Sequence, residues 1–156
     1  MKKALLSGPI IAVIGARSAG KRALAEAEIL GGLIAREGCV LVCGGLGGVM
    51  EAAARGAHTA GGLTIGILPG ERRADANPYI DIAVPTGFGV GRNIVIARTA
   101  EAAIAVRGGY GTLSEIAFFL QMDKPVIGLG SWDIKDVLAA SGPEDALRMA
   151  LERLAR

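Results

Sequence analysis

The sequence predicts an α/β fold in three layers, with a mostly parallel sheet of about six or seven strands and helices on both faces. Short β-branched runs alternate with alanine-rich segments of helical period along the chain of 156 residues, a pattern typical of parallel sheets covered by helices. The composition agrees, because 51% of the residues are hydrophobic, only 21% are charged, and 24 are glycine.

Each element is predicted from its local pattern. Short apolar runs rich in valine and isoleucine indicate buried strands, whereas longer segments of helical period indicate helices. Pro143 suits the start of the last helix, where its missing N–H costs nothing. The predicted strands are 10–15, 39–43, 63–68, 80–84, 103–106 and 125–129. The predicted helices are 19–36, 48–60, 91–100, 113–122, 133–140 and 144–155.

The chain is predicted to form one Rossmann-like domain over residues 1–156. Its length suits a single core, and no internal repeat, low-complexity tract or interdomain linker interrupts the pattern.

Charge and hydropathy exclude several classes of partner. A net charge of +2, with basic residues scattered among acidic ones, and 4% aromatics argue against nucleic-acid binding. No apolar run reaches the length of a membrane span. The N-terminal stretch is similar to a signal peptide but runs directly into a strand and turn pattern, so we expect a cytoplasmic protein.

The chain holds two cysteines and one histidine, which gives little support for a metal site. Cys39 and Cys43 lie too far apart along one strand to form a disulfide and are predicted to be buried thiols. A nucleophile pair of a cysteine with His58 is the alternative.

Three glycine-rich turns, at 15–20, 44–48 and 108–111, each follow a predicted strand and precede a helix. Ligands of open α/β sheets bind at that edge, and helix N-termini there attract anions such as phosphate. Glycine also serves such turns when nothing binds, because it tolerates positive φ and close packing. The convergence of three turns favours a ligand site.

The first turn, GARSAGKR, nearly matches a P-loop. Arg22 stands where the magnesium-binding hydroxyl would be, which argues against an NTPase. Ser18 and Lys21 remain candidate phosphate contacts, although Lys21 also suits a solvated first turn.

The second turn lacks the dinucleotide fingerprint, and no acidic residue ends its strand to bind a ribose hydroxyl. Its glycines still allow backbone N–H groups to approach a ligand closely. These candidate ligand-binding residues are Gly44, Gly45, Gly47 and Gly48.

Two further segments carry candidate side chains. In PTGFGVGRN, Arg92 is placed to bind phosphate or carboxylate, and Asn93 follows it; a plain surface arginine is the alternative. In GGYGTLSE, Thr112 as N-cap would place Glu115 in a capping box. The same carboxylate could instead stabilise a cationic transition state or orient a water.

These residues carry a resemblance to a known family. CGGLGGVMEAAARGA and GRNIVIARTAEAAIAVRGGYGTLSEI resemble the LONELY GUY (LOG)-like superfamily of Rossmann-type nucleotide-binding proteins, once labelled "possible lysine decarboxylase". The pattern G-G-x-G-T-x-x-E is met at Gly108, Gly109, Gly111, Thr112 and Glu115. The segments are still more similar to the bacterial subgroup that includes the molybdenum-cofactor carrier protein.

The resemblance implies Arg92 and Glu115 as catalytic residues, a homodimer, no metal and no required cofactor. It argues against decarboxylation. The sequence departs from the LOG pattern at Arg107, where the motif has proline, and at Asn93, where a lysine is common. Arg107 would add positive charge beside the turn, which favours a ligand with an additional anionic group.

Two functions are therefore expected of one phosphate-binding site. The first is hydrolysis of the N-glycosidic bond of a nucleoside 5′-monophosphate, as in the LOG enzymes. The second is non-catalytic binding of a nucleotide or a molybdopterin-type ligand, as in a carrier or sensor. In both, the phosphate is expected at Gly108, Gly109, Gly111 and Thr112.

Overall fold

The computed structural model describes residues 7–156 and confirms the predicted α/β fold. Seven strands form one sheet in the order β4-β3-β2-β1-β5-β6-β7, and every neighbouring pair is parallel. The strands are β1 (Ile10–Gly15), β2 (Val40–Cys43), β3 (Thr64–Leu68), β4 (Ile82–Pro85), β5 (Ala102–Val106), β6 (Val126–Leu129) and β7 (Val137–Ala139). The helices are α2 (Lys21–Arg36), α3 (Val49–Thr59), α4 (Arg92–Thr99), α5 (Tyr110–Gln121) and α6 (Pro143–Leu154), with 3-10 turns η1 (Arg73–Asp75) and η2 (Gly89–Gly91).

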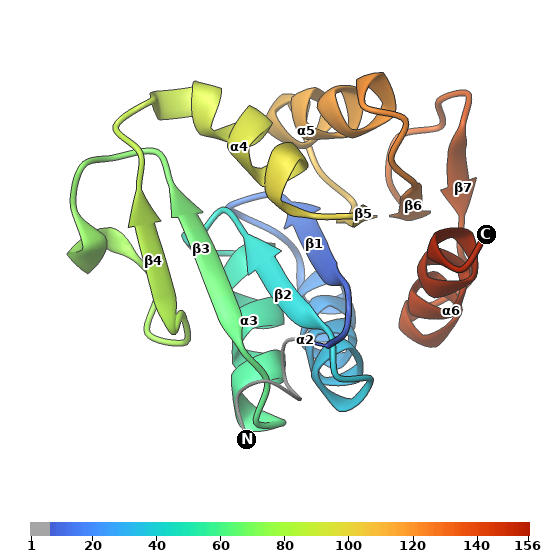
Figure 1. Cartoon of the computed structure of the whole chain (residues 1–156), viewed down its shortest axis with the longest axis horizontal. Helices are drawn as coiled ribbons and strands as arrows, with labels where there is room; N and C mark the ends of the chain where they lie inside the picture. Colours follow the sequence, from blue (N-terminus) through green and yellow to red (C-terminus); the bar gives the residue numbers. More distant parts are fainter. Residues whose placement is uncertain (1–6) are drawn as a thin grey trace.

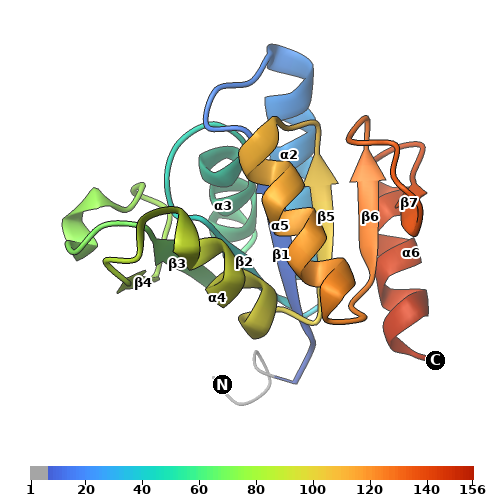
Figure 2. The same cartoon turned by 90° about the horizontal axis from the view of Figure 1, so that it is seen from above.

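The sheet separates two apolar layers (Figures 1 and 2). Side chains of β1 alternate between them, so Ile11 and Val13 pack with α2, α3 and α6, whereas Ala12 and Ile14 pack with α4 and α5. Strands buried on both faces read as continuous apolar runs, which explains why the sequence locates the central strands well.

The predicted helix at 133–140 is wrong. Residues Val137–Ala139 form β7, which pairs with β6 in the register Val126 to Val137 and closes one edge of the sheet. The apolar run there is too short to distinguish strand from helix by period. The free edge of β6 decides between them by supplying backbone hydrogen-bond partners, a tertiary effect that overrides local pattern.

The order of the strands locates the crevice of the fold. Strands β1 to β4 extend outward in one direction, and the chain then crosses back to place β5 on the other side of β1. Such a reversal opens a crevice at the carboxyl ends of the two central strands, the position where ligands of this fold class bind. Across residues 7–156, no helix is both long and apolar enough to cross a bilayer.

Candidate functional site at the carboxyl edge of the sheet

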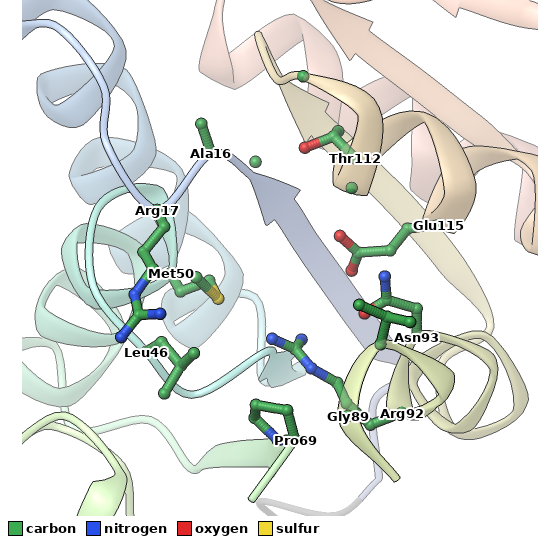
Figure 3. A pocket seen from close by; sticks show the side chains of 14 residues that line it. Ala16, Arg17, Leu46, Met50, Pro69, Gly89, Arg92, Asn93, Thr112 and Glu115 are labelled. Atoms are coloured by element: carbon green, nitrogen blue, oxygen red, sulfur yellow. The ribbon is translucent and has the colours of Figure 1, made fainter.

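A cavity of about 420 Å³ lies at this crevice (Figure 3). Its walls come from the segments after β1, β2, β3 and β5, from η2, and from the N-terminal parts of α3, α4 and α5. The residues that line it are Gly15, Ala16, Arg17, Leu46, Met50, Pro69, Gly89, Val90, Arg92, Asn93, Gly109, Gly111, Thr112 and Glu115.

The turn after β2 packs against the turn after β1. Gly48 has φ of 65° and lies so close to the carbonyl oxygens of Ala16 and Arg17 that no Cβ would fit. The N–H of Val49 donates to the Ala16 oxygen at 3.0 Å. These contacts fix the backbone that carries Arg17 at the cavity wall.

Arg92 begins α4, and its side chain reaches into the cavity. The residue is only 9% exposed, and its guanidinium lies against the Cα of Gly44, where a Cβ would collide with it. Burial lowers the pKa of Arg92, and the nearby Glu115 carboxylate opposes that effect. Among residues 7–156 the guanidinium has no hydrogen-bond or ion-pair partner.

The capping box predicted for Thr112 and Glu115 is wrong. Helix α5 begins at Tyr110 with Gly109 as N-cap, and no side chain caps it. Thr112 and Glu115 therefore lie inside the helix, 3% and 7% exposed, and both line the cavity. The glycines at 108 and 109 let the chain turn into the helix earlier than the threonine signal suggests.

Within residues 7–156, the buried Glu115 carboxylate has no hydrogen-bond or ion-pair partner. Desolvation by burial raises its pKa to about 7, although the charge of Arg92 pulls the pKa down. Both side chains lie in the described part of the chain, and no ion pair joins them. A carboxyl group that titrates near neutrality thus faces a buried cation across open space, an arrangement typical of ligand and active sites.

Hydrogen bonds from neighbouring elements hold the first turn of α5. The Asn93 amide donates to Ser114 Oγ at 3.1 Å, and Ser114 Oγ donates to the Gly111 carbonyl at 2.7 Å. From the segment after β6, Trp132 Nε1 donates to the Gly109 carbonyl at 3.2 Å. Asn93 therefore links α4 to the turn that borders the cavity.

Arg107 does not supply free charge to the cavity, contrary to the expectation from the sequence. Its guanidinium forms an ion pair with Glu26 of α2 at 3.2 Å and donates to the Leu129 carbonyl at 3.1 Å. Its backbone is left-handed, with φ of 52°, and Ser131 Oγ donates to its carbonyl oxygen at 2.7 Å. Arg107 thus braces the start of the turn from outside the cavity.

The structure brings six of the predicted site residues to the cavity wall: Arg92, Asn93, Gly109, Gly111, Thr112 and Glu115. It places seven others off the wall: Ser18, Lys21, Gly44, Gly45, Gly47, Gly48 and Gly108. Ser18 and Lys21 are exposed, and the glycines mostly serve packing. Arg17 also lines the cavity wall, although the sequence did not predict it as a site residue; it lies in the glycine-rich turn at 15–20.

The cysteines are confirmed as free, buried thiols. Cys43 Sγ contacts the Met50 carbonyl at 3.8 Å, and burial raises the pKa of its thiol to about 12. His58 is exposed near the end of α3, 3.7 Å from a carboxylate oxygen of Asp81. The structure therefore excludes the Cys–His pair, and residues 7–156 contain no cluster of three metal-ligating side chains.

Fold and cavity together define a Rossmann-like protein whose cavity lies at the switch between β1 and β5. The chain belongs to the SLOG cluster4 family, whose family model matches residues 8–153. A protein of Archaeoglobus fulgidus is 48% identical over 120 residues, which cover 76% of this chain and 78% of that protein.

Two solved structures have similar folds and names that refer to molybdenum cofactor. The molybdenum cofactor binding protein of Rippkaea orientalis is 39% identical, with a TM-score of 0.90 over 97% of this chain and 99% of that one. The molybdenum cofactor carrier protein of Chlamydomonas reinhardtii is 34% identical, with a TM-score of 0.85 over 96% and 99%.

Proposed function

We propose that the protein is a carrier that binds a phosphorylated pterin of the molybdenum-cofactor type. The observation that carries the proposal is the cavity itself. It is lined by a buried arginine that has no hydrogen-bond or ion-pair partner within residues 7–156, and by the first turn of α5, whose N-terminus has no side-chain cap. Similarity to two molybdenum-cofactor proteins along nearly the whole chain supports this ligand class.

The phosphate would lie at the first turn of α5. Gly109 and Gly111 have open space where a side chain would begin, so an anion can approach the backbone. The helix N-terminus supplies unpaired N–H groups and a positive dipole end, and the Thr112 hydroxyl is a further donor at the cavity wall. The volume of about 420 Å³ lies within the range typical of small-ligand pockets.

Anaerobic titration with molybdenum cofactor released from a denatured molybdoenzyme tests the proposal. We expect saturable binding of one cofactor per chain, recovered chemically unchanged, and at least tenfold weaker binding by Arg92→Gln. Arg98→Gln is the matched control, because Arg98 lies on the same helix, is exposed and does not line the cavity. Absence of binding, or equal loss in both variants, would contradict the proposal.

The burial and the raised pKa of Glu115 favour a second function. A buried carboxylate, free of capping and with a pKa near 7, suits hydrolysis of a nucleoside 5′-monophosphate. The bond between C1′ and the base nitrogen would break, water would add to C1′, and the base would leave protonated, giving ribose 5-phosphate. Ionised Glu115 would stabilise the cationic transition state or accept the proton of the attacking water.

Incubation with AMP distinguishes a hydrolase from a carrier that binds its ligand without reaction. A hydrolase would release adenine at a rate that rises with pH through about 7, where Glu115 becomes ionised, and Glu115→Gln would lose most of that rate. Equal release by wild type and variant would dismiss the catalytic role of Glu115. A carrier would bind ligand without release.

The homodimer implied by the resemblance remains a prediction. We propose that Phe88, Val90 and Ile94 contribute to its interface, because they are exposed by 67%, 87% and 37%. Analytical ultracentrifugation of wild type and Val90→Asp would test this, since a buried aspartate would dissociate the dimer.

A further inference from the structure

Arg17 is a second cation at the cavity that neither the fold nor a salt bridge requires. Its side chain lines the cavity and is largely exposed, whereas its backbone is fixed by the contacts with Gly48. No hydrogen bond or ion pair within residues 7–156 occupies its guanidinium.

Arg17 and Arg92 border the same part of the cavity. The Arg92 guanidinium and the Met50 sulfur both lie against Gly44, and the Arg17 carbonyl lies against Gly48, so the turn at 44–48 adjoins the Arg92 side chain and the Arg17 backbone. Figure 3 shows Arg17, Leu46 and Met50 along one side of the cavity, with Thr112 and Glu115 along the other. The Arg92 guanidinium points between the two sides.

The charges of this region are not balanced by the protein. Arg17, Arg92 and Glu115 are the charged residues on the described cavity wall, and Glu115 is only partly ionised at neutral pH. Arg17 acts on Arg92 as a like charge and lowers its pKa further. Two cations that line one cavity, one of them buried, are stabilised when an anion lies between them, and guanidinium groups bind phosphate and carboxylate in bidentate fashion.

We infer that the cavity holds two anionic groups, one at the first turn of α5 and a second between Arg17 and Arg92 beside the turn at 44–48. This inference rests on the proposed function and specifies the chemical class of its ligand more closely. The ligand class is an organic phosphate that carries another anionic group at its opposite end. Arg17 takes the part that the sequence suggested for Arg107, whose charge Glu26 neutralises.

Titration of the ¹⁵N-labelled protein with inorganic phosphate at low ionic strength tests the inference by nuclear magnetic resonance. We expect two groups of signals to shift with separate dissociation constants. One group comprises the amides of Gly109 and Gly111; the other comprises the amide of Gly47 and the side-chain Nε–H signals of Arg17 and Arg92.

Arg17→Gln should raise the dissociation constant of the second group at least tenfold and leave that of the first within twofold. Arg17→Lys should give an intermediate value, because it keeps the charge and loses the bidentate geometry. Arg36→Gln removes the same charge from the exposed end of α2, and we expect it to change neither constant. The spectra also report whether each variant is folded.

The possible results separate this inference from the proposed function. Shifts confined to Gly109 and Gly111, or equal effects of Arg17→Gln and Arg36→Gln, would overturn the second anion site and leave the proposed function standing. Absence of shifts in both groups would overturn phosphate binding by the cavity, and with it the proposed function.

Discussion

Two glycine-rich turns border the cavity, and they use glycine for different reasons. In the turn at 44–48, the space of a Cβ is already filled, by Arg92 and Met50 at Gly44 and by backbone carbonyls at Gly48. In the turn after β5, a Cβ on Gly109 or Gly111 would meet nothing within 4 Å. Gly44 and Gly48 of the first turn are therefore needed for packing, whereas Gly109 and Gly111 of the second leave space open at the cavity.

The two turns therefore have different roles at the cavity. The turn at 44–48 fixes the backbone of Arg17 and packs against the Arg92 guanidinium, and the turn at 108–111 exposes a helix N-terminus to the cavity. In the sequence, the glycines of the two turns cannot be told apart. Only the atoms that surround each glycine in the structure show which role it has. Alanine at Gly48 and alanine at Gly111 should consequently have opposite effects on the free energy of unfolding.

The largest effect is expected from Gly48→Ala. Its φ of 65° and ψ of −131° strain any other residue by about 1–3 kcal/mol, and collision with the carbonyls of Ala16 and Arg17 adds overpacking of about 1–3 kcal/mol. We expect the free energy of unfolding in urea to fall by roughly 4 kcal/mol. Gly61→Ala is the control for positive φ, since Gly61 has φ of 79° and a Cβ there would meet nothing within 4 Å; an equal loss in both variants would refute the packing argument.

Glu115→Gln tests how much the ionisation of the buried carboxyl group lowers the stability of the fold. Because the folded protein binds this proton more tightly than the unfolded chain, the group's contribution to stability is highest below pH 4.5 and falls as the pH rises to about 7. The interval between the two pKa values corresponds to about 3 kcal/mol. Between pH 4 and pH 8, the free energy of unfolding of the wild type should therefore fall by about 3 kcal/mol relative to that of the variant.

Urea unfolding at several pH values measures this difference. Glu71→Gln is the control, because Glu71 is exposed and does not line the cavity. A pH profile for Glu115→Gln that matches wild type would show that the Glu115 carboxyl group is not the source of the decline.

The sequence predicts the layers and central strands because their signals are local. The run at 10–15 is apolar on both faces, and the structure gives the same bounds for β1. The edge strand β7 escapes such analysis, because three residues carry too little pattern and their conformation depends on pairing with β6.

The site was predicted only in part for a related physical reason. Arg92 and Glu115 could be found because the motif and the resemblance point to them, and both line the cavity. Whether Arg17 or Arg107 lines the cavity depends on contacts with Gly48 and Glu26, which lie 31 and 81 residues away in the sequence. Likewise, the capping box competes with an earlier helix start that only the path of the 108–109 backbone decides.

Gly44→Ala should act on binding through Arg92. A methyl group at this position would occupy the place of the guanidinium, so we expect ligand binding to weaken about tenfold, which corresponds to about 1.4 kcal/mol. A double-mutant cycle with Arg92→Gln, measured by calorimetry, tests whether Gly44→Ala weakens binding by displacing the Arg92 guanidinium. The double variant should bind no more weakly than Arg92→Gln alone, and additive losses would mean that Gly44 acts independently of Arg92.

Gly111→Ala is expected to have the smallest effect and the opposite sign. Gly111 lies in the first turn of α5 with open space at its Cβ position and without a positive φ. Alanine there restricts the unfolded chain and favours the helix, which should raise the free energy of unfolding by about 0.5–1 kcal/mol. The same methyl group would enter the cavity and weaken phosphate binding, as the titration of amide signals would show. A gain in stability with loss of binding identifies a glycine kept for the ligand, whereas a loss of stability would assign this turn to packing, like the turn at 44–48.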